Sequence, residues 1–110
     1  MEERRKSKRF TVSLKAQYFL KERKGSGKEC TVININRSGA GLEFYTSEKI
    51  NVSSSLLLEI FVPDSRESIN VKGILRWFKK GERDFIGGIE VISKSDEEKL
   101  ESLIRLTLGL

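Results

Sequence analysis

Histidine is absent from the 110 residues of this chain, and cysteine and proline each occur once. The lack of histidine removes the usual general base, the commonest metal ligand and the ordinary Ser-His or Cys-His nucleophile pair. The lone cysteine, Cys30, cannot form an internal disulfide, and a free cysteine in a strand-like segment is usually a small buried apolar residue. We therefore expect no catalytic residues, no metal site and no cofactor.

Long apolar runs are also missing. The longest, at residues 56–62, is interrupted by Glu59 and is far shorter than the roughly 20 residues needed to span a bilayer. The charged N-terminus is followed neither by an apolar stretch nor by a small-residue cleavage site, so no secretory signal is readable. We expect a cytoplasmic protein without membrane insertion.

The charges that are present are unevenly distributed. Lysine and arginine exceed aspartate and glutamate by 21 to 16, and five of the six residues from 4 to 9 are cationic. A short segment with like charges and few apolar residues cannot offset the entropy lost on ordering its backbone. We expect a flexible basic arm over residues 1–9, followed by one folded domain over residues 10–110.

Six segments have the composition of β-strands. Residues 10–20 alternate apolar with mostly polar side chains, which is the period of a half-buried strand. The other five segments are separated by turn-forming residues and cover 30–35, 42–45, 54–63, 68–80 and 85–91. Glycines inside the last two segments fit sharp bends or close backbone approach. The pattern predicts a mainly all-β fold, a small six-stranded antiparallel β-barrel.

The end of the chain changes to helical period. Ser95 followed by three acidic residues has the form of a capping box, and apolar residues then recur on one helical face at Leu100, Leu103, Ile104 and Leu108. These features predict a C-terminal α-helix over about 95–108. We expect its apolar face to pack on the barrel, with a dimer or partner surface as the alternative.

Two spaced motifs stand out: Arg5-x-x-x-Arg9 before the first strand, and Asn36-x-Ser38-x-x-Gly41 after the second. Each is common by itself, since one suits any basic segment and the other is ordinary turn chemistry. In this order, with a strand, a turn and a strand between them, they make the chain resemble a PilZ domain over essentially its whole length. The resemblance implies a six-stranded barrel and a bacterial receptor for the second messenger cyclic di-GMP, which is not an enzyme.

The resemblance assigns ligand binding to Arg5 and Arg9. The chemistry suits these residues, because a guanidinium is a planar fork of donors that fits both a phosphate and the O6/N7 edge of guanine. Arg4 directly precedes the motif. In the family an arginine there tends to accompany binding of an intercalated cyclic di-GMP dimer, so Arg4 is a third expected ligand residue.

The resemblance also makes Asn36 and Ser38 the polar pair that reads a guanine base, with Gly41 behind them. Many relatives carry aspartate in place of Asn36. A carboxamide has one accepting oxygen where a carboxylate has two, so we expect a lower affinity. Gly39 is a minor candidate because a side chain there would block the ligand or require a positive φ, and Arg37 is a minor candidate for phosphate binding.

Two residues of the fifth segment, Trp77 and Arg76, are of types that could contribute to a ligand site. Trp77 shares the strand parity of Val71 and Leu75, which favours a place in the core or at the barrel mouth over a stacking surface. Arg76 faces the opposite way and is expected in solvent.

The expected mechanism is that cyclic di-GMP neutralises the arm, orders it against the barrel and changes the surface shown to a downstream protein partner. A monomer and a homodimer both agree with the sequence. Two other functions stay open: a PilZ-like adaptor that binds proteins without a ligand, and a small basic barrel that binds RNA or DNA. Nucleic acid is the less favoured partner, because the charge is concentrated in the arm and no strand has an aromatic-rich exposed face.

Overall fold

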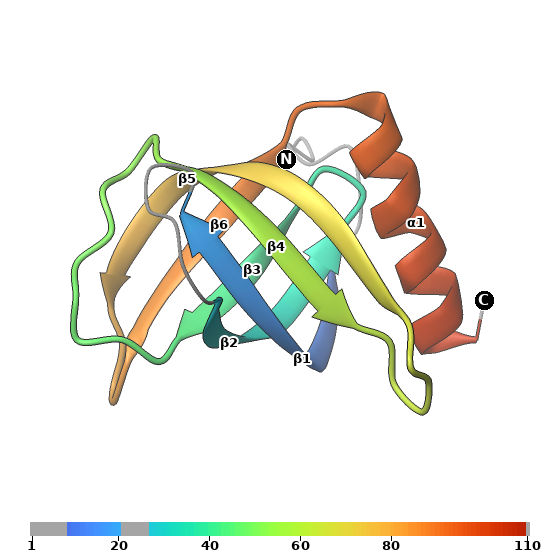
Figure 1. Cartoon of the computed structure of the whole chain (residues 1–110), viewed down its shortest axis with the longest axis horizontal. Coiled ribbons are helices and arrows are strands. Elements are labelled where there is room, and N and C mark those ends of the chain that lie inside the picture. Colours follow the sequence, from blue (N-terminus) through green and yellow to red (C-terminus); the bar gives the residue numbers. More distant parts are fainter. Residues whose placement is uncertain (1–8, 21–26, 110) are drawn as a thin grey trace, which may run out of the picture.

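The computed structural model describes residues 9–20 and 27–109, in which six antiparallel strands close into a barrel with one helix beside it (Figure 1). The strands follow the order β1-β2-β3-β6-β5-β4 around the barrel. The elements are β1 (Phe10–Leu20), β2 (Lys28–Asn36), β3 (Gly39–Phe44), β4 (Ser55–Phe61), β5 (Ser68–Lys80), β6 (Phe85–Val91) and α1 (Lys94–Leu108). The predicted six-stranded barrel with a C-terminal helix is confirmed. The arm at residues 1–8 lies outside the described part of the chain.

Alternation along the strands sends every second side chain into the barrel. In β1 the buried positions are Leu14, Ala16 and Tyr18, each no more than 3% exposed. Cys30 on β2 is buried beside them, as expected, and this burial raises the pKa of its thiol to about 12. The thiol is therefore neutral and serves as a small apolar core residue.

Aromatic side chains fill the barrel near the turn that joins β5 to β6. Phe44 packs edge-on against Tyr18 and Phe78, with ring centroids 5.1 and 5.3 Å away, and Phe78 stacks on Phe85 at 4.7 Å. Helix α1 covers the opposite end, where β5 begins and β2 ends (Figure 1). The core is thus closed at both ends by side chains.

Helix α1 begins at Lys94, one residue before the predicted range of about 95–108, and its N-cap lies two residues before Ser95. Ser93 is the N-cap, and its hydroxyl accepts a 3.0 Å hydrogen bond from the backbone N–H of Asp96. Leu100, Leu103 and Ile104 join the barrel core, as expected. Leu108, the fourth predicted member of that apolar face, is 38% exposed. No helix within residues 9–20 and 27–109 is long and apolar enough to cross a membrane.

Two β-bulges change which side chains face outward. One lies in β2 between Val32 and Asn34, and the other in β5 between Leu75 and Trp77. An extra residue shifts the alternation by one position. The prediction that Trp77 shares a face with Val71 and Leu75 is therefore wrong. Trp77 is 39% exposed on the outer wall, and Phe78 points into the core in its place.

Candidate functional site

Glycines form a flat strip on the outer wall across β3 and β6. In one row of paired residues Gly39 lies between Asn36 and Glu90, and in the next row Gly41 is paired with Asn34 and with Gly88. Neither Gly39 nor Gly41 has a positive φ, so the expected conformational reason for these glycines does not hold. Gly39 is needed for space, because a Cβ there would meet the carbonyl oxygen of Ile89. A Cβ at Gly41 would lie 2.6 Å from Nδ2 of Asn34, at the end of a side chain that can move aside.

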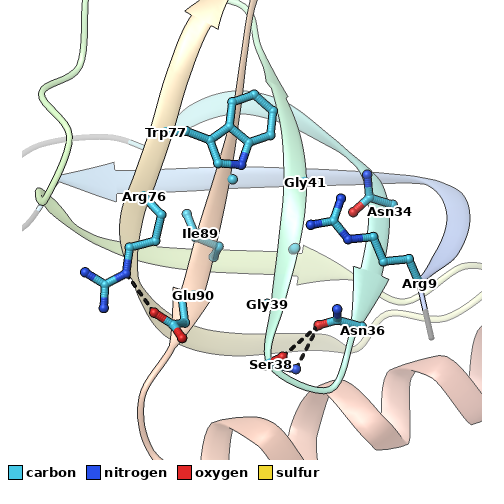
Figure 2. A pocket seen from close by; sticks show the side chains of 12 residues that line it. Arg9, Asn34, Asn36, Ser38, Gly39, Gly41, Arg76, Trp77, Ile89 and Glu90 are labelled. Atoms are coloured by element: carbon cyan, nitrogen blue, oxygen red, sulfur yellow. Dashed lines mark hydrogen bonds and ion pairs between the residues drawn. The ribbon is translucent and has the colours of Figure 1, made fainter. Parts of the chain in front are cut away.

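This strip is the floor of a pocket of about 220 Å³, which we call the glycine trough (Figure 2). Arg9 and Asn36 stand on one side of the β3 strip, and Glu90 and Arg76 stand on the other (Figure 2). Both bulges contribute to its walls, since they turn Asn34 and Trp77 outward. The lining residues are Arg9, Asn34, Asn36, Ser38, Gly39, Ala40, Gly41, Arg76, Trp77, Gly88, Ile89 and Glu90.

The turn between β2 and β3 is fixed by its own side chains. The Oδ1 atom of Asn36 accepts hydrogen bonds from the backbone N–H of Ser38 at 2.9 Å and from its hydroxyl at 3.2 Å. The Ser38 carbonyl oxygen in turn accepts from the N–H of Val91 at 2.9 Å, which ties the turn to the end of β6. An Asx turn of this kind holds the two residues in one arrangement before any ligand arrives.

The structure brings five of the eight candidate residues to one place. Arg9, Asn36, Ser38, Gly39 and Gly41 all line the glycine trough. Arg4 and Arg5 lie outside the described residues. The sequence expectation that Gly39 and Gly41 belong to the turn is corrected, because both are in strand β3.

The eighth candidate, Arg37, does not line the trough. Its guanidinium points to helix α1 and forms an ion pair with Glu97, with 3.6 Å between Nη2 and Oε1. The turn and the helix are thereby joined at the surface. Arg37 is half exposed, so the pair contributes little to stability.

Seven further residues of the trough were not predicted as site residues, and four of them have polar or aromatic side chains: Asn34, Arg76, Trp77 and Glu90. Trp77 was placed on the wrong face because a bulge cannot be read from alternation alone. Glu90 and Asn34 carried no motif, and only the pairing of β2, β3 and β6 shows that they face the same strip. Arg76 donates a 2.7 Å hydrogen bond from Nε to Oε1 of Glu90, so the two opposite charges meet at the trough edge.

Comparisons with known proteins agree on one domain family. Residues 3–109 match the PilZ domain. A comparison with curated protein sequences gives no match. Three solved structures share the fold over nearly the whole chain.

The first is the inhibitor of motility (MotI/DgrA) of Bacillus subtilis, with a TM-score of 0.71 and 17% identity. That comparison covers 98% of this chain and 53% of the other, so the chain spans about half the length of that protein. The second is the PilZ domain of YcgR from Escherichia coli with c-di-GMP, with a TM-score of 0.76, 13% identity, and coverage of 98% of this chain and 92% of that one.

The third is the PilZ domain of CeSA from a cellulose-synthesizing bacterium, with a TM-score of 0.65 and 14% identity. It covers 94% of this chain and 97% of the other. At these identities the solved structures show the barrel fold, and the match over residues 3–109 shows the family. The chain belongs to the PilZ domain family.

Proposed function

We propose that this chain is a bacterial cyclic di-GMP receptor that binds the dinucleotide in and around the glycine trough. The observation that carries the proposal is convergence: Arg9, directly before β1, meets the turn at Asn36 and Ser38 and the first residues of β3 at a single pocket. Those positions are far apart in sequence and match the two halves of the family's ligand motif. The similar PilZ domain of YcgR, whose structure contains c-di-GMP, supports the same ligand.

The size and chemistry of the trough suit part of this ligand. Its volume of about 220 Å³ is below the roughly 300–1,000 Å³ typical of pockets that enclose a drug-sized molecule. In this proposal one guanine lies in the trough over the glycine strip, and the phosphates remain at the surface near Arg9. Trp77 provides an aromatic surface at the trough wall on which a base can stack.

Arginines of the N-terminal motif complete the proposed site. A guanidinium binds a phosphate through two parallel charge-assisted hydrogen bonds, which a lysine ammonium cannot reproduce. Arg5 joins Arg9 on the phosphates, and Arg4 supplies a further cation where the ligand binds as an intercalated dimer. Binding rearranges residues 1–9 against the barrel, and a downstream protein partner responds to the changed surface. The chain itself catalyses no reaction and acts in the cytoplasm.

Calorimetric titration with cyclic di-GMP tests this function and reports affinity and stoichiometry together. We expect binding that weakens with salt, and a loss of about 10- to 150-fold in Arg9→Ala and in Arg5→Ala, since each removes charge-assisted hydrogen bonds. Arg83→Ala is the matched control, because Arg83 lies between β5 and β6, outside the trough.

Two results would contradict the proposal. Absence of binding to the intact chain at millimolar ligand in dilute buffer would remove the receptor function and favour a ligand-free protein adaptor. Equal binding of short oligonucleotides, weakened alike by Arg83→Ala and Arg9→Ala, would instead indicate nonspecific attraction of polyanions.

A further inference from the structure

The Asn36 side chain lacks a free acceptor for a base. Its oxygen has two lone pairs, and both are engaged, by the backbone N–H of Ser38 at 2.9 Å and by the Ser38 hydroxyl at 3.2 Å. The orientation of the amide follows from the chemistry, because a backbone N–H must donate and so must face the oxygen. Only the NH₂ group of Asn36 remains available, and it is a donor.

A guanine in the trough requires acceptors as well as donors. Its Hoogsteen edge carries the acceptors N7 and O6, which suit the NH₂ group of Asn36 and the guanidinium of Arg9. Its Watson–Crick edge presents two adjacent donors, N1–H and the N2 amino group. A buried donor left without an acceptor costs about 1–3 kcal/mol, so this edge needs a partner within the site.

Glu90 is the one carboxylate among the twelve described residues that line the trough. Its position is set by strand pairing: Gly39 is paired with Asn36 on one side and with Glu90 on the other. Adjacent strands are about 4.8 Å apart, which separates Asn36 and Glu90 by roughly 10 Å across a floor without side chains. A guanine lying on that floor can direct its Hoogsteen edge toward Asn36 and Arg9 and the adjoining Watson–Crick edge toward Glu90, since these residues stand on the two sides of the floor (Figure 2).

Arg76 holds the carboxylate at this place. Its Nε donates to Oε1 of Glu90 at 2.7 Å, and a carboxylate has further lone pairs on both oxygens. Arg76 lies in the β5 bulge, and strand β6 separates β5 from the glycines of β3. The ion pair therefore limits the orientations of Glu90 without filling the trough.

We propose that Glu90 determines base specificity by accepting the N1–H and N2–H donors of guanine, with Arg76 as its positioning residue. The inference rests on the proposed function, since it places a guanine of cyclic di-GMP in the trough. It explains how a site whose Asn36 has no free acceptor still offers a carboxylate to the base. It also predicts selectivity, because adenine presents the N1 lone pair where guanine presents N1–H, and a carboxylate rejects it.

Because the ligand is negatively charged, the direction in which a Glu90 substitution changes the affinity tests this inference. Removing an acid beside a dianionic ligand should strengthen binding if Glu90 is merely a nearby charge. If Glu90 accepts from guanine, Glu90→Gln should instead weaken cyclic di-GMP binding about tenfold. Glutamine can donate to and accept from adenine, so the preference for cyclic di-GMP over cyclic di-AMP should fall in this variant. Glu90 is half exposed, so the substitution leaves the core intact.

The control is Glu43→Gln. Glu43 is the one acid of β3, where it accepts a hydrogen bond from Tyr45 outside the trough, so it reports the effect of one lost negative charge alone. We expect its affinity to be unchanged or slightly tighter, with the same preference between the two dinucleotides. Arg76→Ala should lower that preference, and Arg76→Lys should restore part of it.

The outcomes separate the two proposals. If the intact chain binds cyclic di-GMP and Glu90→Gln binds equally well or better, the role of Glu90 is wrong and the receptor function stands. If the intact chain does not bind cyclic di-GMP, the receptor function and this inference both fail. Weaker binding by Glu90→Gln with an unchanged preference between the dinucleotides would overturn the assignment of base specificity.

Discussion

Two hollows lie on the outer wall of the barrel, and they differ in what surrounds them. The glycine trough has a volume of about 220 Å³ and is bordered by two arginines, two asparagines, a serine and a glutamate. The second hollow, which we call the apolar groove, has a volume of about 820 Å³ and is lined by apolar residues of β1, β4 and β5 and the exposed Ile92, with polar and charged residues beside them at Ser55, Asn70, Lys72, Ser93, Asp96 and Lys99. The two hollows therefore differ in volume and in how much apolar surface surrounds them.

Two charged side chains of the apolar groove, Asp96 and Lys99, are bonded to the protein itself. Asp96 accepts from the backbone N–H of Lys72 at 3.3 Å, and Lys99 donates to the carbonyl of Asn70 at 2.9 Å. These contacts fasten helix α1 to the start of β5. In the trough, polar groups from four separate segments converge on an open floor, and one pair of them, Arg76 and Glu90, is bonded in the same way. The comparison teaches that the volume of a hollow and the convergence of polar groups around it are separate properties, and the proposed site rests on the second.

The largest expected effect comes from filling the trough floor. In Gly39→Ala the added Cβ meets the backbone carbonyl of Ile89, which cannot rotate away, so strands β3 and β6 must separate. We expect a loss of about 1–3 kcal/mol in the free energy of unfolding, measured with urea, and a loss of cyclic di-GMP binding. Leu57→Ala in the apolar groove should leave binding unchanged. A Gly39→Ala protein with the stability and affinity of the parent would show that the floor tolerates side chains.

Removal of the trough aromatic comes next. Trp77→Ala should weaken the binding of cyclic di-GMP about tenfold, measured by calorimetry, because base stacking on an aromatic side chain contributes about 1–3 kcal/mol. Phe61→Ala is the matched control, since Phe61 is an aromatic of similar exposure, 41% against 39%, on β4. Equal losses in the two variants would contradict a specific role for the trough.

Trp77 also offers a direct signal, since it is the only tryptophan in the chain. Titration with cyclic di-GMP should change its fluorescence, with a midpoint that agrees with calorimetry. The change should be absent in Arg9→Ala at ligand concentrations that saturate the parent. An unchanged spectrum at saturation would place the ligand away from the trough wall.

A smaller effect is expected where the turn meets the helix. The Arg37–Glu97 ion pair spans 3.6 Å between side chains that are 51% and 29% exposed. Because such pairs are screened by water, a double-mutant cycle with Arg37→Ala and Glu97→Ala should give a coupling below about 1 kcal/mol in urea unfolding. A larger coupling would mean that the trough and helix α1 are linked more tightly than the geometry indicates.

The smallest effect is on the stability of the protein at low pH, and it comes from Glu59 on β4, a strand that also lines the apolar groove. Hydrogen bonds from Gln17 and Ser68 lower the pKa of the Glu59 carboxyl below its ordinary value. The unfolded chain then binds this proton more readily, so the stabilisation is present above the unfolded pKa and is lost as pH falls through the folded value. Glu59→Gln should therefore flatten the decrease in unfolding free energy below about pH 4. An unchanged acid dependence would show that the exposed carboxyl is fully screened.

Sequence patterns predicted those parts of the molecule that depend on local chemistry. Apolar alternation located β1 at its observed bounds, and helical spacing identified three buried residues of α1. The Arg9 and Asn36–Gly41 positions were found through the family motif. What failed were features decided by pairing between distant strands.

Trp77 illustrates the reason. The face of the sheet on which its side chain lies is decided by one extra residue in β5 relative to β6. Nothing in the local alternation distinguishes such a bulge from a regular strand. Glu90 was missed for a similar reason. Its place across the trough from Asn36 depends on two strand pairings, Asn36 with Gly39 and Gly39 with Glu90. The start of helix α1 was misplaced because Ser93 and Ser95 both precede acidic residues, and only the hydrogen bond to Asp96 selects between them.

Closure of the barrel has a consequence for assembly. Since each strand is hydrogen-bonded to a neighbour on both sides, the described circumference presents no free β-edge for another chain to extend. Recruitment by strand addition is thereby disfavoured. Any protein that responds to this domain must recognise its side chains, and a bound nucleotide changes that pattern wherever it covers them.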